Sequence, residues 1–224
     1  MPSRKLDQGA APFVPRTRSL TRLAEAAQGC EGCDLFARAT QTVFGSGPHD
    51  AVLVAVGEQP GDEEDRAGQP FVGPAGRVLD ELLEDAGIDR RLVYVTNAVK
   101  HFKWEPRGKR RMHSRPSPWQ VSACHPWLEA ELALVPAKVV VCLGATAAKS
   151  MLGSAFRLTQ SFGQVLESGG RQVIATYHPS AILRMPDPEE RARARQQLRD
   201  DLKKAWNLAL VPHTRTRSAP HGVE

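Results

Sequence analysis

The chain has 224 residues, of which 41% are hydrophobic and 25% charged, and its formal net charge is +5. This length suits one α/β domain with a substantial core and is short for two domains. No segment approaches the roughly 18 consecutive apolar residues of a membrane span, and the N-terminus lacks the apolar core of a secretory signal. We therefore expect a cytoplasmic protein without a membrane partner, whose four cysteines are ligands or buried thiols rather than disulfides.

Both ends of the chain differ in character from the middle. Residues 1–18 contain three prolines and no hydrophobic periodicity, so we expect a flexible arm there. Residues 211–224 have the same composition and are expected to form a flexible tail. The sequence thus predicts a single domain over residues 19–210.

Short apolar runs alternate with helical patterns between these ends. The apolar runs predict strands at residues 51–56, 92–95, 138–143 and 172–176. The helical patterns cover residues 76–86, 127–134, 145–152 and 188–206. Strands that alternate with helices favour a parallel sheet covered on both faces, so the predicted fold class is α/β.

Three chemically dense segments follow predicted strands. They read GEQPGDEED (57–65), TNAVKHF (96–102) and YHPSAILR (177–184). Ligands of parallel sheets bind beyond the carboxyl ends of the strands. We therefore expect the three segments to form one site, although each taken alone could be an ordinary turn.

The cysteines divide into two groups. Cys30 and Cys33 form a C-x-x-C pair, and Cys124 follows far downstream. Such a pair indicates a metal site, zinc included, or an incidental pair. Cys142 lies inside an apolar strand and is predicted to be core.

Basic residues concentrate in 100–115 and 184–204. Such clusters suit a polyanion, because each neutralised phosphate releases a counterion. The alternative is a solvated basic surface, and the string GKRRMH (108–113) by itself also fits a solvated loop.

Five motifs in order resemble the iron–sulfur uracil-DNA glycosylases of the family-4 type, from about Leu20 to Asn207. They are GEQPGDEED, QPFVGPAGRVLDELL, VYVTNAVK, VVCLGATAAKSMLG and YHPSAILR. GKRRMH, together with Gln59 in GEQPG, is similar to the X-type branch (UdgX), which forms a covalent adduct with DNA after removing uracil. The resemblance implies a three-layer α/β/α sandwich around a short parallel sheet.

The resemblance also implies a [4Fe–4S] cluster. The family usually holds it with four cysteines, but this chain has His101 at the third place, as the X-type branch does. The implied ligands are therefore Cys30, Cys33, His101 and Cys124. Imidazole can replace thiolate at iron–sulfur centres, and we expect the cluster to have a structural role.

The resemblance assigns roles to three sets of residues. His178 is expected to stabilise the departing uracil, and Glu58 to stabilise the sugar cation or to accept a proton, while Phe71 stacks on the base. The catalytic set is His113, Glu58, His178 and Gln59. The substrate-binding set is Gly57, Asp62, Glu64, Phe71, Asn97 and Ser180. The DNA-binding set is Lys109, Arg110, Arg111 and Arg184.

His113 is the expected nucleophile that captures the sugar. It must be neutral to attack, and we expect Lys109, Arg110 and Arg111 to lower its pKa by charge repulsion. The expected partner is uracil-containing DNA, single-stranded and double-stranded, and we expect a monomer. Two alternatives stay open: a turnover glycosylase whose basic loop only holds phosphate, and a non-catalytic iron–sulfur DNA-binding module.

Overall fold

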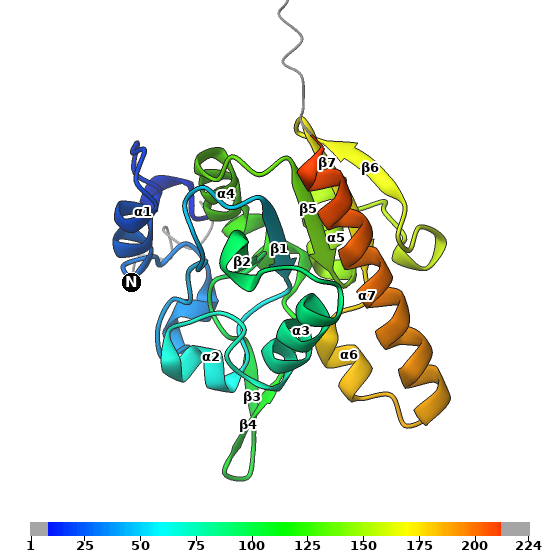
Figure 1. Cartoon of the computed structure of the whole chain (residues 1–224). Helices are drawn as coiled ribbons and strands as arrows, with labels where there is room; N and C mark the ends of the chain where they lie inside the picture. The colour runs from blue at the N-terminus through cyan, green and yellow to red at the C-terminus, as the bar shows by residue number, and fades with distance from the viewer. Residues whose placement is uncertain (1–8, 212–224) are drawn as a thin grey trace, which may run out of the picture.

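A five-stranded sheet forms the centre of the structure, a computed structural model that describes residues 9–211 (Figure 1). Its strand order is β2-β1-β5-β7-β6, and β6 alone runs antiparallel to its neighbour β7. The strands are β1 (Leu53–Gly57), β2 (Val93–Asn97), β5 (Val139–Leu143), β6 (Val165–Ser168) and β7 (Arg171–Thr176).

The strands β1, β2 and β5 are buried along their whole length. Their continuous β-branched runs are typical of parallel strands that are covered on both faces. Successive residues point to opposite faces, so that Leu53 and Ala55 enter one core and Val54 and Val56 enter the other.

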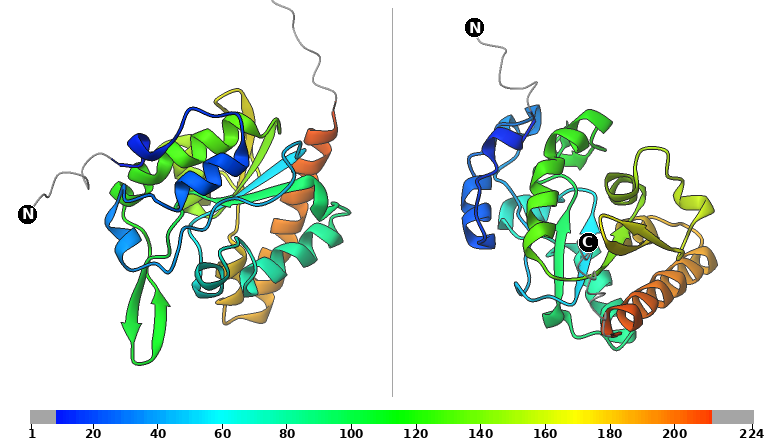
Figure 2. Two further views of the ribbon diagram at one scale, coloured as in Figure 1. Left: turned by 90° about the vertical axis from the view of Figure 1, so that its left-hand side faces the viewer. Right: turned by 90° about the horizontal axis from the view of Figure 1, so that it is seen from above.

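Helices cover both faces (Figures 1 and 2). One layer packs with Leu53 and Ala55 and consists of α3 (Pro74–Asp85), α6 (Pro179–Leu183) and α7 (Pro188–Leu210). The opposite layer consists of α4 (Pro118–Leu134) and α5 (Ala145–Leu152), with α1 (Leu20–Ala27) packed on α4. The predicted three-layer α/β/α sandwich is confirmed. Within residues 9–211 no helix combines the length and the apolar character needed to cross a membrane.

Helix α4 begins at Pro118, well before the residue 127 that the pattern predicted. A capping box starts it: the Gln120 N–H donates to Ser117 Oγ, and Gln120 Oε1 accepts the Ser117 N–H. Pro126 lies inside the helix. A proline in mid-helix removes a backbone donor, which is why the sequence suggested a later start.

Residues 9–18 correct the predicted N-terminal arm. Ala10 is buried, and its N–H donates to the carbonyl of Ala123 in α4. This part of the arm therefore packs on the domain. Residues 1–8 of the arm and 212–224 of the tail lie outside the described residues.

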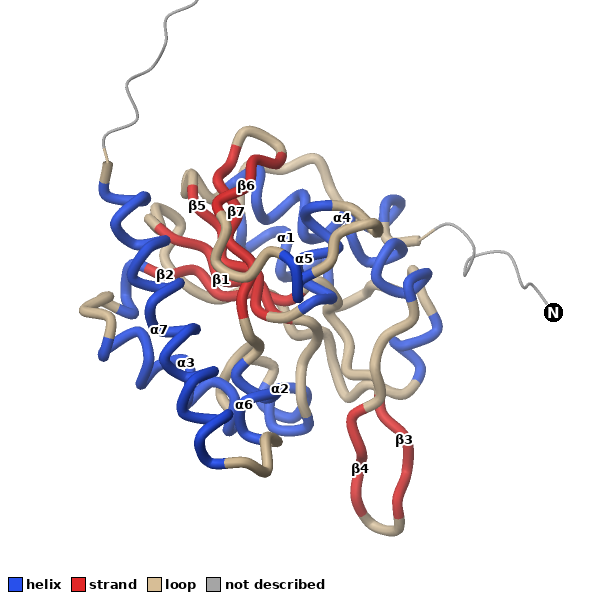
Figure 3. The backbone as a smooth tube through the Cα atoms, turned by 90° about the vertical axis from the view of Figure 1, so that its right-hand side faces the viewer, coloured by secondary structure: helices blue, strands red, loops and turns tan. Residues whose placement is uncertain are grey.

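A two-stranded hairpin leaves the body of the domain below the sheet (Figure 3). Its strands are β3 (Trp104–Arg107) and β4 (Arg110–His113), paired with Trp104 opposite His113. Gly108 makes the turn at φ +60°, which glycine adopts without a steric penalty. The basic string GKRRMH is thus the turn and second strand of a hairpin rather than a loop.

Candidate active site

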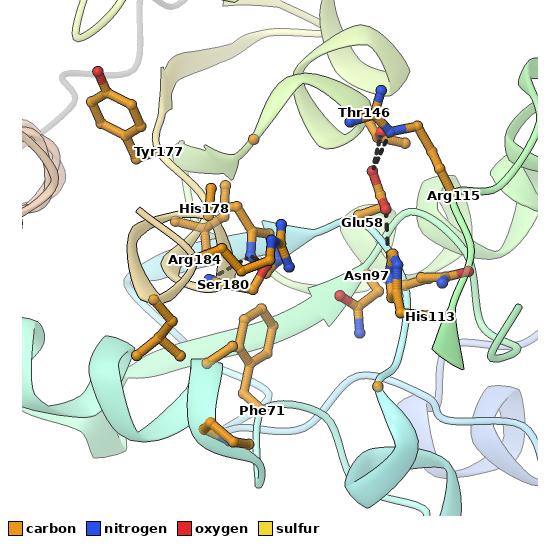
Figure 4. A pocket seen from close by; sticks show the side chains of 18 of the residues that line it. Glu58, Phe71, Asn97, His113, Arg115, Thr146, Tyr177, His178, Ser180 and Arg184 are labelled. Carbon is orange, nitrogen blue, oxygen red and sulfur yellow. Dashed lines mark hydrogen bonds and ion pairs between the residues drawn. The ribbon is translucent and has the colours of Figure 1, made fainter. Parts of the chain in front are cut away.

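A cavity of about 770 Å³ lies at the carboxyl ends of the parallel strands (Figure 4). Strand β1 ends next to Glu58, β2 ends at Asn97, and β7 ends shortly before His178. These three side chains and His113 from the hairpin line the same cavity. The expected convergence of three loops is therefore what the structure shows, with the hairpin as a fourth contributor.

Glu58 lies at the centre of the polar contacts in this cavity. Its Oε1 is 3.4 Å from Nε2 of His113, and its Oε2 accepts a hydrogen bond from the hydroxyl of Thr146 (Figure 4). The guanidinium of Arg115 lies 3.9 Å from the same carboxylate. Thr146 and Arg115 were not predicted. Thr146 follows the carboxyl end of β5, where ligands of parallel sheets bind, so the sequence could have indicated it.

The environment of His113 favours the neutral imidazole. Partial burial is the main cause that lowers its pKa below the ordinary value; Glu58 opposes the shift, and Arg184 and Arg115 add to it. The prediction that the three basic residues before His113 produce this shift was wrong, because the repelling charges come from Arg184 and Arg115.

His178 is also held neutral, and its tautomer follows from its partners. Burial lowers its pKa to about 4, with smaller contributions from Arg184 and His113. Its Nδ1 accepts the backbone N–H of Ser180 at 3.0 Å, so the ring proton of the neutral form belongs on Nε2. The ring lies near that of Phe71, with centroids 6.4 Å apart and planes at 23° (Figure 4). His178 therefore has a donor to offer on its remaining nitrogen.

Phe71 occupies a strained position beside the cavity. Its φ is +58°, the one positive φ among the non-glycine residues in 9–211. Such strain persists only where the surroundings impose it, and it concentrates at functional sites. The first turn of α3 packs tightly against this residue, since a Cβ on Gly76 would lie 1.7 Å from the carbonyl oxygen of Phe71.

Gln59 does not direct its amide toward a reacting group. Its Nε2 donates to the carbonyls of Lys103 and Ser114, and its Oε1 accepts the Lys103 N–H at 3.1 Å. Lys103 and Ser114 directly flank the hairpin. Gln59 thus fixes the open end of the hairpin, and it also lines the cavity, so its catalytic role stays a prediction.

Arg111 is a predicted phosphate contact. Its guanidinium is ion-paired with Asp62 and Asp65, and its side chain is only 15% exposed. It also lies over the rings of Phe102 and Trp104. In this structure Arg111 is therefore held by the carboxylates of Asp62 and Asp65, and its contact with phosphate stays a prediction.

The other predicted contacts lie in different places. Lys109 and Arg110 are exposed near the hairpin turn, while Arg184 and Ser180 line the cavity. Glu64 also lines it, and its carboxylate accepts the N–H groups of Gly61 and Gly73, which orders the loop before α3.

Three of the predicted ligand residues share one buried cluster near α1 and α4. Cys30, Cys33 and Cys124 are buried there with Trp127, whose indole N–H donates to Cys30 Sγ at 3.2 Å. Burial raises the pKa of Cys33 to about 11 and of Cys124 to about 12, and the other two thiols contribute to the shift of Cys124. Cys142 lies apart in the sheet core, as predicted.

The fourth predicted ligand, His101, is buried, and its Nε2 lies 2.9 Å from the hydroxyl of Thr42. Over residues 9–211 no three His, Cys, Asp or Glu side chains lie close enough to hold a single metal ion. The donor set itself suits an iron–sulfur cluster, because three buried thiols share this region and two of them, Cys30 and Cys124, accept N–H donors.

Known proteins resemble the chain over most of its length. The family model of the uracil DNA glycosylase superfamily matches residues 44–203, which include the cavity and the sheet. A Type-4 uracil-DNA glycosylase of Thermotoga maritima is 38% identical, over 82% of this chain and 91% of the relative. One of Archaeoglobus fulgidus is 35% identical, over 85% and 93%. A Type-5 enzyme of Thermus thermophilus is 35% identical over 62% of this chain and 68% of its own.

The matched region, the cavity at the strand ends and the order of the motifs agree with one another. The chain belongs to the uracil-DNA glycosylase superfamily.

Proposed function

We propose that this protein excises uracil from DNA and then becomes covalently bonded to the abasic sugar through His113. Relatives named uracil-DNA glycosylases support the excision. The observation that carries the covalent step is the approach of His113 to Glu58, with Nε2 3.4 Å from Oε1, in the cavity that also holds His178.

Uracil recognition requires the nucleotide to leave the stack, because a paired base cannot reach the cavity. The ring of Phe71 offers a stacking surface, and the amide of Asn97 offers both a donor and an acceptor to the polar edge of the base. Arg184 at the cavity and the exposed Lys109 and Arg110 are the proposed phosphate contacts.

Cleavage sends both electrons of the glycosidic bond to the base. The Nε2–H of neutral His178 donates to the oxygen on which negative charge develops, and the carboxylate of Glu58 stabilises the sugar cation. A donor already in place costs no reorganisation during the reaction. The uracil anion then takes a proton from water.

Capture forms one bond between a ring nitrogen of His113 and the sugar carbon. The lone pair of the neutral imidazole attacks, the ring becomes cationic, and its remaining N–H proton leaves. Glu58 is the nearest carboxylate and is the proposed acceptor of that proton. Glu58 passes this proton to the hydroxide that remains when the uracil anion takes a proton from water. The products are free uracil, a neutral, alkylated His113 and the original Glu58 carboxylate, so atoms and charge balance.

The proposed cofactor is a [4Fe–4S] cluster on Cys30, Cys33, His101 and Cys124. Such a cluster would cross-link the N-terminal segment to α4 and supply rigidity, with no part in the excision. The backbone N–H of Lys100 donates to Cys124 Sγ, and N–H donors of this kind stabilise thiolate ligands.

A second candidate is a turnover glycosylase in which water attacks the sugar. The side chain of His113 is 45% exposed, so water can reach the same place. The number of uracils released per protein chain separates the two functions.

A denaturing gel with uracil-containing single-stranded DNA tests the proposal. We expect an adduct that survives heating in detergent and about one uracil released per chain, since only a covalent bond withstands this treatment. His113→Ser should abolish the adduct while uracil release continues, because Glu58 and His178 act before capture.

Three outcomes would contradict the proposal. A detergent-stable adduct with His113→Ser would assign the bond to another residue. Many uracils released per wild-type chain would favour the turnover enzyme, and none at all would favour a non-catalytic DNA-binding module.

A further inference from the structure

A buried ion pair lies behind the candidate active site and has no part in the proposed chemistry. Lys100 follows β2 and is 1% exposed, and Glu131 on α4 is 0% exposed. Burial of two charges costs several kcal/mol per ion in general, and apolar residues often replace such pairs without loss of stability. Stability alone therefore does not explain why the pair is present.

Glu131 is held by three groups from two parts of the chain, Gly45 and strand β2. Its Oε1 accepts the Gly45 N–H at 2.8 Å and the Tyr94 hydroxyl at 3.0 Å, and its Oε2 accepts the Thr96 hydroxyl at 2.9 Å. These three donors fix the carboxylate without any contribution from Lys100. The carboxylate is therefore a fixed counter-charge for the ammonium group.

Lys100 uses all three ammonium donors. They go to Glu131, to the Thr96 hydroxyl at 2.7 Å and to the backbone carbonyl of Asn97 at 2.8 Å. The last bond is the important one, because it fixes the peptide that directly follows the proposed uracil-reading residue.

That peptide is continuous with the loop that carries Glu58. The Ala98 N–H donates to the carbonyl of Gly57 at 2.9 Å, and the Val99 N–H donates to the carbonyl of Glu58 at 3.0 Å. Residues 97–99 therefore extend the pairing of β1 and β2 beyond the strand ends, and the ammonium group of Lys100 supports this extension from behind.

We propose that Lys100 is a positioning residue for uracil excision, which holds the peptides of Asn97 and Glu58 in register, and that Glu131 is its counter-charge. The proposal rests on the proposed excision activity. It names neither residue as a contact of the substrate, because both lie behind the cavity wall.

Three variants separate positioning from stability. Glu131→Gln keeps an acceptor for Gly45 and Tyr94 but leaves Lys100 without a counter-charge. Lys100→Met leaves Glu131 as an unpaired buried charge. The double variant Lys100→Met with Glu131→Gln removes both charges, but the Asn97 carbonyl still has no donor.

The test measures the melting temperature of each variant and its single-turnover rate of uracil release from single-stranded DNA. The release assay is run at a temperature well below the melting temperature of every variant. Both single variants should melt at lower temperatures, and the double variant should recover most of that loss. The limiting rate should nevertheless stay about 10- to 100-fold below wild type in both variants that carry Met at position 100. The enzyme concentration for half-maximal rate should be unchanged, because phosphate contacts are intact.

Glu131→Gln, which keeps Lys100, should release uracil at a rate within about threefold of wild type.

Arg171→Met is the matched control. Arg171 donates to the carbonyls of Val135 and Ala137, at the end of α4 remote from the cavity. This variant should melt at a lower temperature than the wild-type protein and release uracil at the wild-type rate. A double variant that regains both stability and rate would overturn the positioning role. No uracil release from the wild-type protein would instead contradict the proposed excision.

Discussion

At Gly57 the main chain passes so close to two cavity side chains that no side chain fits. A Cβ there would lie 2.3 Å from Oδ1 of Asn97 and 2.8 Å from Cζ of Phe71. Both contacts are far inside van der Waals distance, so one of the two side chains would have to move. The absence of a side chain at Gly57 thus leaves the space that Asn97 and Phe71, the proposed base-recognition residues, occupy.

Gly57→Ala should therefore slow uracil release about 10- to 100-fold, because displacement by 1 Å in a site can cost that much. Single-turnover release from a uracil oligonucleotide measures it. Gly169→Ala is the control: Gly169 has φ +56° and no atom near its missing Cβ, so its substitution strains the backbone only. Equal rates for Gly57→Ala and wild type would show that the two side chains do not need this space.

The hairpin is the element that brings His113 into the cavity, and two sets of contacts hold it. Gln59 holds the open end of the hairpin through hydrogen bonds to Lys103 and Ser114. Arg111 joins the second strand of the hairpin to Asp62 and Asp65. Alternation along the strand explains why Arg111 is held inward while Arg110 stays exposed. One basic string thus contains residues with different roles.

These roles predict different salt dependences. Replacing Lys109 and Arg110 with Ala should flatten the slope of log affinity against log salt by about 1.4 on single-stranded DNA, since each phosphate contact contributes about 0.7. Arg111→Ala should leave that slope unchanged and lower the yield of covalent adduct, because Asp65 loses its partner and the hairpin its anchor. A slope reduced by Arg111→Ala as well would mean that Arg111 does reach phosphate.

The sequence predicted the parallel strands and helix α5 because their patterns are local. Buried parallel strands are continuous apolar runs, and Ala145–Leu152 has the bounds expected for its helix. The start of α4 was not predicted, because it depends on a cap at Ser117 and on tolerance of Pro126. Strand β6 was not predicted either: it is short and partly exposed at the sheet edge, so it has no such run.

At the scale of the whole molecule, one edge of the sheet collects the candidate site. The rule that ligands bind at the carboxyl ends of parallel strands was enough to place Glu58, Asn97 and His178 together. That rule does not predict contacts between residues that are distant in sequence. The pairing of Arg111 with Asp65, and of Lys100 with Glu131, depends on how α2 (Asp62–Ala67) and α4 pack, which no local pattern encodes.

Lys100 connects the thiol cluster to the candidate site: its backbone N–H donates to Cys124 Sγ, and its ammonium group donates to the carbonyl of Asn97. We therefore expect loss of the proposed cluster to lower the stability of the folded protein before it affects uracil release. Binding of a metal group to the folded state alone stabilises that state, so removal of one ligand lowers the melting temperature.

Cys124→Ala should consequently remove the iron and lower the melting temperature, whereas Cys142→Ala should keep about four irons per chain. The two thiols are a matched pair, since both are fully buried and burial raises the pKa of each. Both substitutions leave a cavity of similar size, so a difference in iron content reports ligation rather than packing. Iron assay, visible absorbance and thermal melting measure the outcome. Zinc in place of iron in the wild-type protein would contradict the iron–sulfur cluster. Equal iron in both variants would contradict the assignment of Cys124 as a ligand, because removal of a ligand should cause loss of the metal.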